Sequence, residues 1–367
     1  MAAGKAETTD DEASARAEAC IRATPKVELH VHLEGAVRPA RFLAICRRHG
    51  LHPEFGSVSD LTWLFQHSDF PEFLDHFRFV VTCLRDTQDV HDIACDLFRE
   101  LLAQNVVYAE VLFSGAIFVR MGMPWQELLA AVAAAESTVL EPRRRGALLP
   151  RYNLVIDLVR NFGPEFAALQ VEALAEIAHP SVVGVHLGGD EVAQPARLFA
   201  GAYAAARAAG LGAAAHAGEG DGAASVRDAL EFLQVSRIGH GIRCLEDADV
   251  VRELLLCGTT LEVCPTSNVC TRIVPDLARH PLPELLRRGL RVTLGADDPS
   301  YFDTDLTREM LVAHRVLGLD LAQIDAMTDA GMMAAFLPAQ QKAAALAWLR
   351  AERAVLEQSL RSRSAES

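Results

Sequence analysis

The sequence is poor in lysine and has no excess of positive charge. Only Lys5, Lys26 and Lys342 are lysines, and 35 basic against 49 acidic residues leave a net charge of −14. Nucleic acids and anionic membranes are both bound through Lys and Arg, so this balance argues against either kind of partner. No uninterrupted apolar stretch is long enough to cross a bilayer.

Cysteine motifs and a secretion signal are also missing. The eight cysteines are scattered and contain no CxxC pair. Because disulfide frameworks belong to short secreted chains, we expect reduced thiols in a cytoplasmic protein. The first 23 residues are acidic and rich in alanine, and they lack the basic start and apolar run of a signal peptide. We expect a flexible tail over residues 1–23.

What the sequence does contain is a regular alternation of short apolar runs and helical patterns, and half of its 367 residues are hydrophobic. The predicted strands are Val27–Val31, Val106–Phe113, Tyr152–Leu158, Val182–Leu187, Gly212–Ala215, Arg237–Ile238, Thr260–Val263 and Arg291–Leu294. The predicted helices between them are Arg38–His49, Gln126–Arg144, Glu165–Ala178, Pro195–Ala209, Ala224–Leu233, Asp247–Leu256 and Pro283–Arg288. Strands that alternate with helices imply a parallel sheet, and eight such units predict an α/β fold of the (β/α)8 TIM-barrel type.

Two regions add to this barrel. Residues 51–104, between the first two strands, hold the helical patterns Leu61–Gln66, Pro71–Leu84 and Val90–Gln104. An insertion there lies over the C-terminal mouth of the barrel, where such enzymes keep their sites. The last strand is followed by the closing helices Asp305–Val316, Asp320–Ala334 and Ala339–Ser359. We therefore expect a single domain over residues 24–359 and a frayed end over residues 360–367.

Histidine and aspartate follow three of the predicted strands in a pattern typical of a metal site. The first strand ends in His30-Val31-His32, and on a strand both imidazoles point to the same side. The fifth strand ends at His216 and the eighth is followed by Asp297. Three histidines and one carboxylate can hold zinc and leave a position for water, so these four residues are the predicted ligands of one zinc ion.

Two further polar residues lie at the same end of the barrel. Glu219 comes three residues after His216, and His240 follows the sixth strand between two glycines. A hydrolytic zinc site needs a proton donor and a group that orients the attacking water. We expect Glu219 to supply the first and His240 the second.

These motifs resemble those of the adenosine deaminase family. The opening stretch PKVELHVHLEG, at residues 25–35, is similar to the first family motif. HAGE at 216–219, RIGHG at 237–241, LEVCPTSN at 261–268 and DDP at 297–299 resemble the later motifs in the same order. The likeness runs from about Thr24 to Pro338. It implies a barrel fold and hydrolysis of the 6-amino group of an adenine ring.

The resemblance also implies individual roles. Glu219 would protonate the purine N1, and His240 would hold or deprotonate the attacking water. The backbone N–H of Gly189 would contact N3, and Asp298 would bind N7. The other residues implied in substrate binding are His32, Glu34, Ser114 and the lid residues Phe70, Phe73, Leu74 and Phe77. The spacing of the lid residues equally suits core packing of a helix.

Three features point to different branches of the family. Adenosine-specific members usually have Asp where this chain has Glu34, and Glu also appears there in adenine deaminases. The stretches Leu187–Gly189 and Val269–Arg272 look more like aminodeoxyfutalosine deaminases. We therefore expect a 6-aminopurine nucleoside as substrate, with adenosine first, aminodeoxyfutalosine second and free adenine third. His186 stands where Asp is common, with no assigned role, and the remaining histidines, including His280, are expected in surface or structural positions.

Three other classes of protein are disfavoured. A two-metal barrel hydrolase would need a bridging lysine after the fourth strand, and none of the three lysines lies there. Zinc deaminases of the cytidine type carry HxE and PCxxC, whereas this chain has HxxE and Cys-Pro. A non-catalytic binding protein on the same fold would tolerate the loss of a ligand or of Glu219, and all are present. The sequence carries no signal for the oligomeric state.

Overall fold

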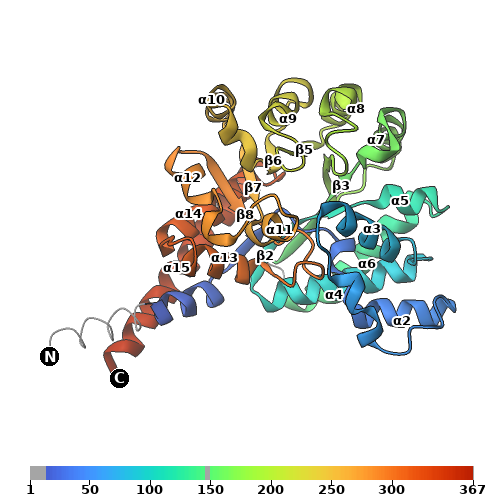
Figure 1. The fold of residues 1–367 in the computed structure, drawn as a ribbon. Coiled ribbons are helices and arrows are strands. Elements are labelled where there is room, and N and C mark those ends of the chain that lie inside the picture. Colours follow the sequence, from blue (N-terminus) through green and yellow to red (C-terminus); the bar gives the residue numbers. More distant parts are fainter. Residues whose placement is uncertain (1–13, 145–148, 367) are drawn as a thin grey trace.

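The chain folds into a barrel of eight parallel strands that follow one another in sequence order. The structure is a computed structural model, and it describes residues 14–144 and 149–366. The strands are β1 (Lys26–Glu28), β2 (Val106–Phe113), β3 (Arg151–Asp157), β4 (Val182–His186), β5 (Gly212–Ala217), β6 (Arg237–His240), β7 (Thr260–Val263) and β8 (Arg291–Leu294). Figure 1 shows them at the centre with the helices around them. The predicted (β/α)8 fold is confirmed.

The two ends of the sheet meet through single hydrogen bonds instead of a full ladder. The N–H of Asp297 donates to the carbonyl of His30 at 3.0 Å, and the N–H of His32 donates to the carbonyl of Asp297 at 2.8 Å. A parallel bridge pairs Val31 with Asp297. The barrel is therefore joined, just beyond the ends of β1 and β8, by residues that the sequence predicts as metal ligands.

The helices occupy the predicted places with small changes at their ends, except for the short helices α5 (Gly115–Arg120) and α11 (Pro265–Cys270), which the sequence did not predict. They are α2 (Pro39–His49), α3 (Phe70–Val81), α4 (Thr87–Ala103), α5 (Gly115–Arg120), α6 (Trp125–Arg144), α7 (Pro164–Ile177), α8 (Ala200–Ala208), α9 (Ala223–Asp228), α10 (Ala248–Cys257), α11 (Pro265–Cys270), α12 (Leu282–Arg287), α13 (Leu306–Arg315), α14 (Leu321–Ala334) and α15 (Ala339–Glu366). Short 3₁₀ or π turns are η1 (Glu34–Ala36), η2 (Val58–Phe65), η3 (Arg160–Phe162), η4 (Ala196–Phe199), η5 (Ala229–Leu233), η6 (Ile242–Glu246) and η7 (Leu277–Arg279).

Aspartate side chains determine where several helices begin. Asp69, Asp86, Asp305 and Asp320 accept the N–H three residues later at the start of α3, α4, α13 and α14. Such caps satisfy N–H groups that have no partner inside the helix.

Strand lengths differ most from expectation at β1, β5 and β6, and β5 continues two residues past its predicted end, to Ala217. β1 ends at Glu28, three residues before the predicted end, whereas β6 continues through Gly239 and His240. The apolar pattern overestimates β1 because Leu29 and Val31 are buried without being part of a strand. It misses the end of β6 because glycine and histidine carry no strand signal.

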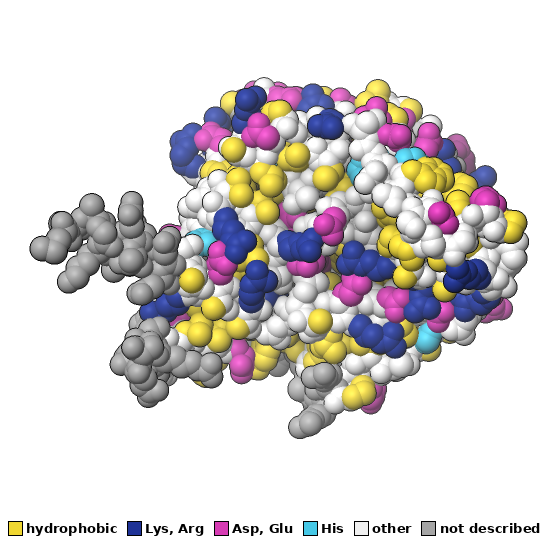
Figure 2. Space-filling model, turned by 60° about the horizontal axis from the view of Figure 1, so that its bottom comes forward, with side chains coloured by type: hydrophobic (Ala, Val, Ile, Leu, Met, Phe, Trp, Pro, Cys, Tyr) yellow, Lys and Arg dark blue, Asp and Glu magenta, His cyan; other side chains and the backbone are white. Residues whose placement is uncertain are grey.

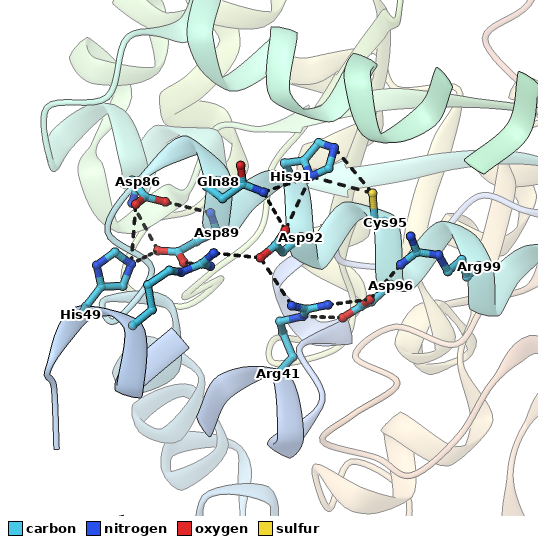
Figure 3. Close-up of polar contacts among 11 residues, drawn as sticks. Arg41, His49, Asp86, Gln88, Asp89, His91, Asp92, Cys95, Asp96 and Arg99 are labelled. Carbon is cyan, nitrogen blue, oxygen red and sulfur yellow. Dashed lines mark hydrogen bonds and ion pairs between the residues drawn. The ribbon is translucent and has the colours of Figure 1, made fainter. Parts of the chain in front are cut away.

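The insertion after β1 is anchored by a row of ion pairs between α2 and α4 (Figure 3). Arg41 donates two hydrogen bonds to Asp96, of 2.6 and 3.0 Å. Asp89 is fully buried, accepts the N–H of Arg85 at 2.6 Å and pairs with His49 at 2.8 Å. The helix α3 lies between α2 and α4 in the sequence. The ion pairs between α2 and α4 therefore hold together the two segments that flank α3.

The interior of the barrel contains a buried ionic cluster. Arg237 is fully buried, forms an ion pair with Glu110, and has its Nε 2.6 Å from Glu262 Oε1. Its guanidinium also stacks on the ring of Phe336, 3.8 Å from the centroid. Glu262 in turn bonds His30 Nδ1 at 2.8 Å. The charge of Arg237 thus connects the core to the top of β1.

Both chain ends differ from the sequence expectation. Residues 14–23, predicted as part of a flexible tail, are helical, and Ile21 is buried. Glu18 forms an ion pair with Arg315, and the two terminal helices lie together in Figure 1. The helix α15 continues to Glu366, through the residues for which the sequence predicts a frayed end. Residues 1–13, which complete the predicted tail, and residue 367 lie outside the described residues.

The surface mixes charges of both signs. On the face drawn in Figure 2, Lys and Arg side chains lie among Asp and Glu side chains, and no large region carries one sign. Within residues 14–144 and 149–366, no helix is long and apolar enough to cross a bilayer.

The packing around Phe336 leads to a stability prediction. A Cβ at Gly212 would lie 2.3 Å from Phe336 ring atoms, and the ring cannot move freely because Arg237 stacks on it. Gly212→Ala should lower the free energy of unfolding by about 1–3 kcal/mol, the usual cost of overpacking. Gly201→Ala is the control because a Cβ there meets nothing within 4 Å, and this variant should be neutral or slightly more stable. Urea unfolding of both variants checks this, and equal stabilities would contradict it.

Candidate active site

A cavity of about 440 Å³ opens at the C-terminal mouth of the barrel. Its deep wall is formed by residues that follow the strands, namely His32, Ser114, Asp157, Gly188, Gly189, His216, Glu219, Asp297 and Asp298. Its outer wall is formed mainly by α3 and by residues at α5 and η3, namely Phe70, Phe73, Leu74, Phe77, Arg78, Ile117, Arg120, Met121 and Phe162. The residues predicted from the sequence for one site are thus largely brought to one cavity.

Four buried side chains form a candidate metal centre, and three of them, His32, His216 and Asp297, line the cavity. Ligand atoms of His30, His32, His216 and Asp297 all lie within 4.8 Å of one another. Asp297 Oδ1 is 3.4 Å from His30 Nε2 and 3.3 Å from His32 Nε2.

The donor set fits a divalent metal ion. His30 Nε2 and His216 Nδ1 are buried and make no hydrogen bond in the described part of the chain. The other ring nitrogen of His30 bonds Glu262 at 2.8 Å, and such a partner orients a metal-binding imidazole. Ser267 Oγ donates to Asp297 Oδ2 at 2.6 Å and holds that carboxylate in the same way. Neither Glu262 nor Ser267 was identified from the sequence as a site residue, although both lie in the LEVCPTSN motif.

The backbone at the site is held in an uncommon conformation. Asp297 has φ of 62° and His240 has φ of 57°, both in the left-handed region. Side-chain-bearing residues adopt this region only where the surrounding structure imposes it, often at functional sites. Here it turns both side chains toward the cavity end of the barrel.

Glu219 lies at the top of β5 beside the metal centre. Its Oε2 is 3.4 Å from His240 Nε2, and its backbone is fixed by Glu191, which accepts the N–H groups of Gly218, Glu219 and Gly220 at 3.0–3.2 Å. Burial raises the pKa of Glu219 well above its usual value, and the neighbouring Asp297 adds to the shift. A raised pKa favours the protonated form of Glu219, which can donate a proton. Glu191 was not singled out in the sequence, because a short Gly-Gly-Asp-Glu stretch carries no signal for its partners.

Asp298 presents a second buried carboxyl group to the cavity. Its Oδ1 has no hydrogen-bond partner in the described part of the chain. Burial raises its pKa well above the usual value, which favours the protonated form that can donate a hydrogen bond. It reaches this position only because residue 35 is glycine, since a Cβ there would lie 1.9 Å from Asp298 Oδ1.

Gly189 lies in the loop after β4, at φ of 104°. A Cβ there would lie 2.4 Å from Asn161 Oδ1, so both the conformation and the space require glycine. The loop is fixed by Asp157, which accepts the N–H of Gly188 at 2.6 Å and the hydroxyl of Ser114 at 3.1 Å. The N–H of Gly189 donates to no group in the described residues. Asp157 is a further cavity residue that the sequence did not reveal.

Glu34 lies elsewhere than the sequence led us to expect. It is fully buried behind Ser114, whose N–H it binds at 3.0 Å, and it does not line the cavity. Burial raises its pKa to about 8, helped by the nearby Asp157. Its other oxygen, Oε2, has no hydrogen-bond partner in the described part of the chain, so the contact between Glu34 and substrate stays a prediction. The side chain also holds the start of α5.

The residues predicted to form a lid lie at the cavity and also pack against neighbouring rings. Phe73 and Phe77 line the cavity from α3. Phe73 also packs on Tyr301 and Phe302, with ring centroids 5.5 and 5.1 Å apart. The alternatives of core packing and lid are therefore not exclusive.

His186 is fully buried behind the metal centre and does not line the cavity. Its ring lies 4.5 Å from that of His216, and its Nδ1 is 3.8 Å from Asp157 Oδ1. Burial lowers its pKa to about 4, so it is a neutral imidazole.

A parallel barrel with this cluster at its C-terminal mouth is the arrangement of a metal-dependent hydrolase of the amidohydrolase superfamily. Comparison with known families is more specific: the adenosine deaminase family model matches residues 25–351. The chain belongs to the adenosine deaminase family, and it is a metal-dependent hydrolytic deaminase.

Individual relatives agree with this assignment. The chain is 38% identical to an adenine deaminase of Chelativorans sp. (strain BNC1), over 89% of this chain and 98% of that protein. It is also 38% identical to an aminodeoxyfutalosine deaminase of Acidothermus cellulolyticus, over 81% and 84%. A solved amidohydrolase from Burkholderia ambifaria, described with bound Zn, superposes with a TM-score of 0.85 at 27% identity and covers 95% of both chains.

The metal centre leads to a prediction about binding. The purified protein should hold one tightly bound divalent metal ion per chain, and His216→Ala should lose it because one of four ligands is removed. Chelation should also lower Tm, since the metal stabilises only the folded state. His179→Ala, away from the cavity, is the control. Elemental analysis decides the question, and two stoichiometric ions, or an unchanged metal content in His216→Ala, would sink this assignment.

Proposed function

We propose that this protein hydrolyses the 6-amino group of a purine that carries a substituent at N9, and that it uses one zinc ion. The observation that supports this most directly is that Glu219, whose pKa is raised by burial, lines the same cavity as three of the four candidate metal ligands, His32, His216 and Asp297. Zinc is favoured because three imidazoles and one carboxylate suit it, and because the Burkholderia ambifaria relative is described with bound Zn. When bound, zinc lowers the pKa of water and so makes it a nucleophile near neutral pH.

The residues of the chain divide the remaining work. Glu219 gives its proton to N1, which makes C6 electrophilic. The oxygen of water bonds to C6, the C6–N bond breaks, and the amino group leaves as ammonia after it takes up a proton. The same ring is held by two donors, the N–H of Gly189 toward N3 and the neutral carboxyl of Asp298 toward N7. Each of these groups lines the cavity.

The order of candidate substrates changes from the sequence expectation. The relatives described above are named adenine deaminase and aminodeoxyfutalosine deaminase, and neither is named adenosine deaminase. Adenosine therefore becomes the third candidate. A cavity of about 440 Å³ lies in the range of sites for drug-sized ligands, well above the need of a free purine base. This cavity volume favours aminodeoxyfutalosine as the first candidate and leaves adenine as the second.

The mouth of the cavity supports an extended N9 arm that ends in an anion. Arg120 lines it and stacks on the rings of Phe162 and Phe166, at 4.5 and 5.6 Å. Arg120 forms no ion pair with a carboxylate in the described residues, so its charge is open to a ligand. The apolar lid residues on α3 can pack against the part of the N9 substituent that lies between the purine and Arg120.

The role of Glu219 is tested by removing its proton while keeping its size. Glu219→Gln should reduce kcat by about 10²–10⁴-fold, the usual effect of losing a general acid. The metal content should stay unchanged, because Glu219 is not one of the four ligands. Glu172→Gln, on the exposed face of α7, is the matched control. Near-normal turnover by Glu219→Gln would show that another group protonates the ring.

The substrate order is tested by kcat/KM for adenine, adenosine, adenosine 5′-monophosphate and aminodeoxyfutalosine. We expect aminodeoxyfutalosine to be the best of the four. Arg120→Met should lower kcat/KM about 5- to 50-fold for the two substrates with a charged arm and leave adenosine unchanged. Arg252→Met, an exposed arginine paired with Asp249, is the control. Turnover of adenine alone would replace this proposal with adenine deamination.

A further inference from the structure

A chain of three polar side chains runs behind His240. His280 is almost fully buried, with 3% of its surface exposed, and lies between η7 and α12. Its Nε2 is 3.1 Å from Asn268 Oδ1, and Asn268 Nδ2 is 3.1 Å from His240 Nδ1. The sequence led us to expect His280 in a surface or structural position, but the structure connects it to a residue of the candidate active site.

The directions of the two hydrogen bonds that join His280, Asn268 and His240 follow from the surroundings of His280. The backbone N–H of Leu282 donates to His280 Nδ1 at 3.1 Å, and a backbone N–H can only donate. His280 Nδ1 therefore carries no proton, so its Nε2 carries one and donates to the Asn268 oxygen. The amide nitrogen of Asn268 is then left to donate to His240 Nδ1.

The reverse arrangement is excluded by the same counting. If the Asn268 amide were turned over, its nitrogen would donate to His280 Nε2, while Leu282 donates to Nδ1. Both nitrogens of His280 would then lack a proton, which a neutral imidazole does not allow. Burial lowers the pKa of His280 to about 4, which agrees with a neutral ring.

We propose that this relay holds His240 with its proton on Nε2, so that His240 donates a hydrogen bond to the attacking water instead of removing its proton. His280 and Asn268 are then positioning residues that act through His240. The inference rests on the proposed hydrolytic function and assigns the role that the family resemblance left open between holding and deprotonating the water.

The surroundings of His240 Nε2 agree with a donor. The atom is buried, makes no hydrogen bond in the described part of the chain, and has Glu219 Oε2 at 3.4 Å and Asp297 Oδ2 at 3.7 Å. Although burial opposes it, the surrounding histidines hold the pKa of Asp297 below its usual value, so its oxygen is an acceptor to which an N–H is attracted. The short helix α11 positions both Asp297 and His240, since Ser267 binds Asp297 and the next residue, Asn268, binds His240.

The proton of the water then needs another acceptor. Once Glu219 has given its proton to N1, its carboxylate is free to take a proton from the water as the oxygen bonds to C6. It passes this proton to the departing amino group, which leaves as ammonia as the C6–N bond breaks. The hydroxyl group left on C6 then gives its proton to the Glu219 carboxylate as C6=O forms, and this restores the acid. Protons and bonds balance without a base at His240.

The relay is tested with Asn268→Asp, which keeps the shape but offers only acceptors when ionised. His240 must then donate from Nδ1, which leaves Nε2 without a proton. We expect kcat to fall about 10²–10⁴-fold with KM within about threefold, as expected when an active-site histidine is held in the wrong tautomer. If His240 is instead a base, the same change makes Nε2 more basic, and kcat stays or rises.

A second readout does not depend on turnover. Proton–nitrogen correlation spectra of ¹⁵N-histidine protein report which ring nitrogen carries the proton, and the His240 signal is identified by its loss in His240→Ala. We expect an Nε2 proton in the metal-loaded wild type, and kcat should follow the tautomer in every variant. His280→Gln keeps a donor toward Asn268, so it should retain the tautomer and most of kcat. His179→Gln is the control for the effect of replacing a histidine by glutamine away from the site.

Two results would overturn the proposal: an Nδ1 proton on His240 in the wild type, or a switched tautomer with unchanged kcat in Asn268→Asp. Failure of the function itself looks different, because the wild-type protein would then turn over no 6-aminopurine whatever the tautomer of His240. Metal content is measured in each variant, so that loss of the metal is not mistaken for loss of the relay.

Discussion

The interior of the barrel depends on the buried charge of Arg237. Its guanidinium neutralises Glu110 and Glu262 and stacks on Phe336. Without it, two carboxylates would be left buried and unpaired, which is strongly destabilising. Glu262 passes the constraint on to the site, because it also binds the ring nitrogen of His30 that faces away from the other metal ligands. The packing of the core and the orientation of the metal ligand His30 therefore depend on the same carboxylate.

Closure of the barrel makes a similar link at the other side of the site. The strands β1 and β8 are joined by backbone hydrogen bonds of His30, His32 and Asp297. Each of these residues is also part of the candidate metal centre. A metal ion held by their side chains would join the two edges a second time, so metal binding and barrel closure support each other.

Around this centre, side chains from distant parts of the chain fix those that act on substrate. Glu191 holds the loop of Glu219, Asp157 holds the loop of Gly189, and Asn268 holds the ring of His240. Each support is buried and bonds directly to the group or loop that it positions. Such fixed surroundings let a few polar groups meet one substrate geometry without rearrangement.

The sequence by itself determined the family, the barrel and the residues at the strand ends. Strand and helix periodicity is local, so β2, β7 and β8 were predicted with their observed bounds, and His30, His32, His216 and Asp297 could be identified. Only the tertiary structure decided the partners: that Glu262 binds His30, 232 residues away, and that Glu34 binds the N–H of Ser114. The reason is physical, since a periodic pattern shows which face of an element is buried but not which distant side chain will lie against it.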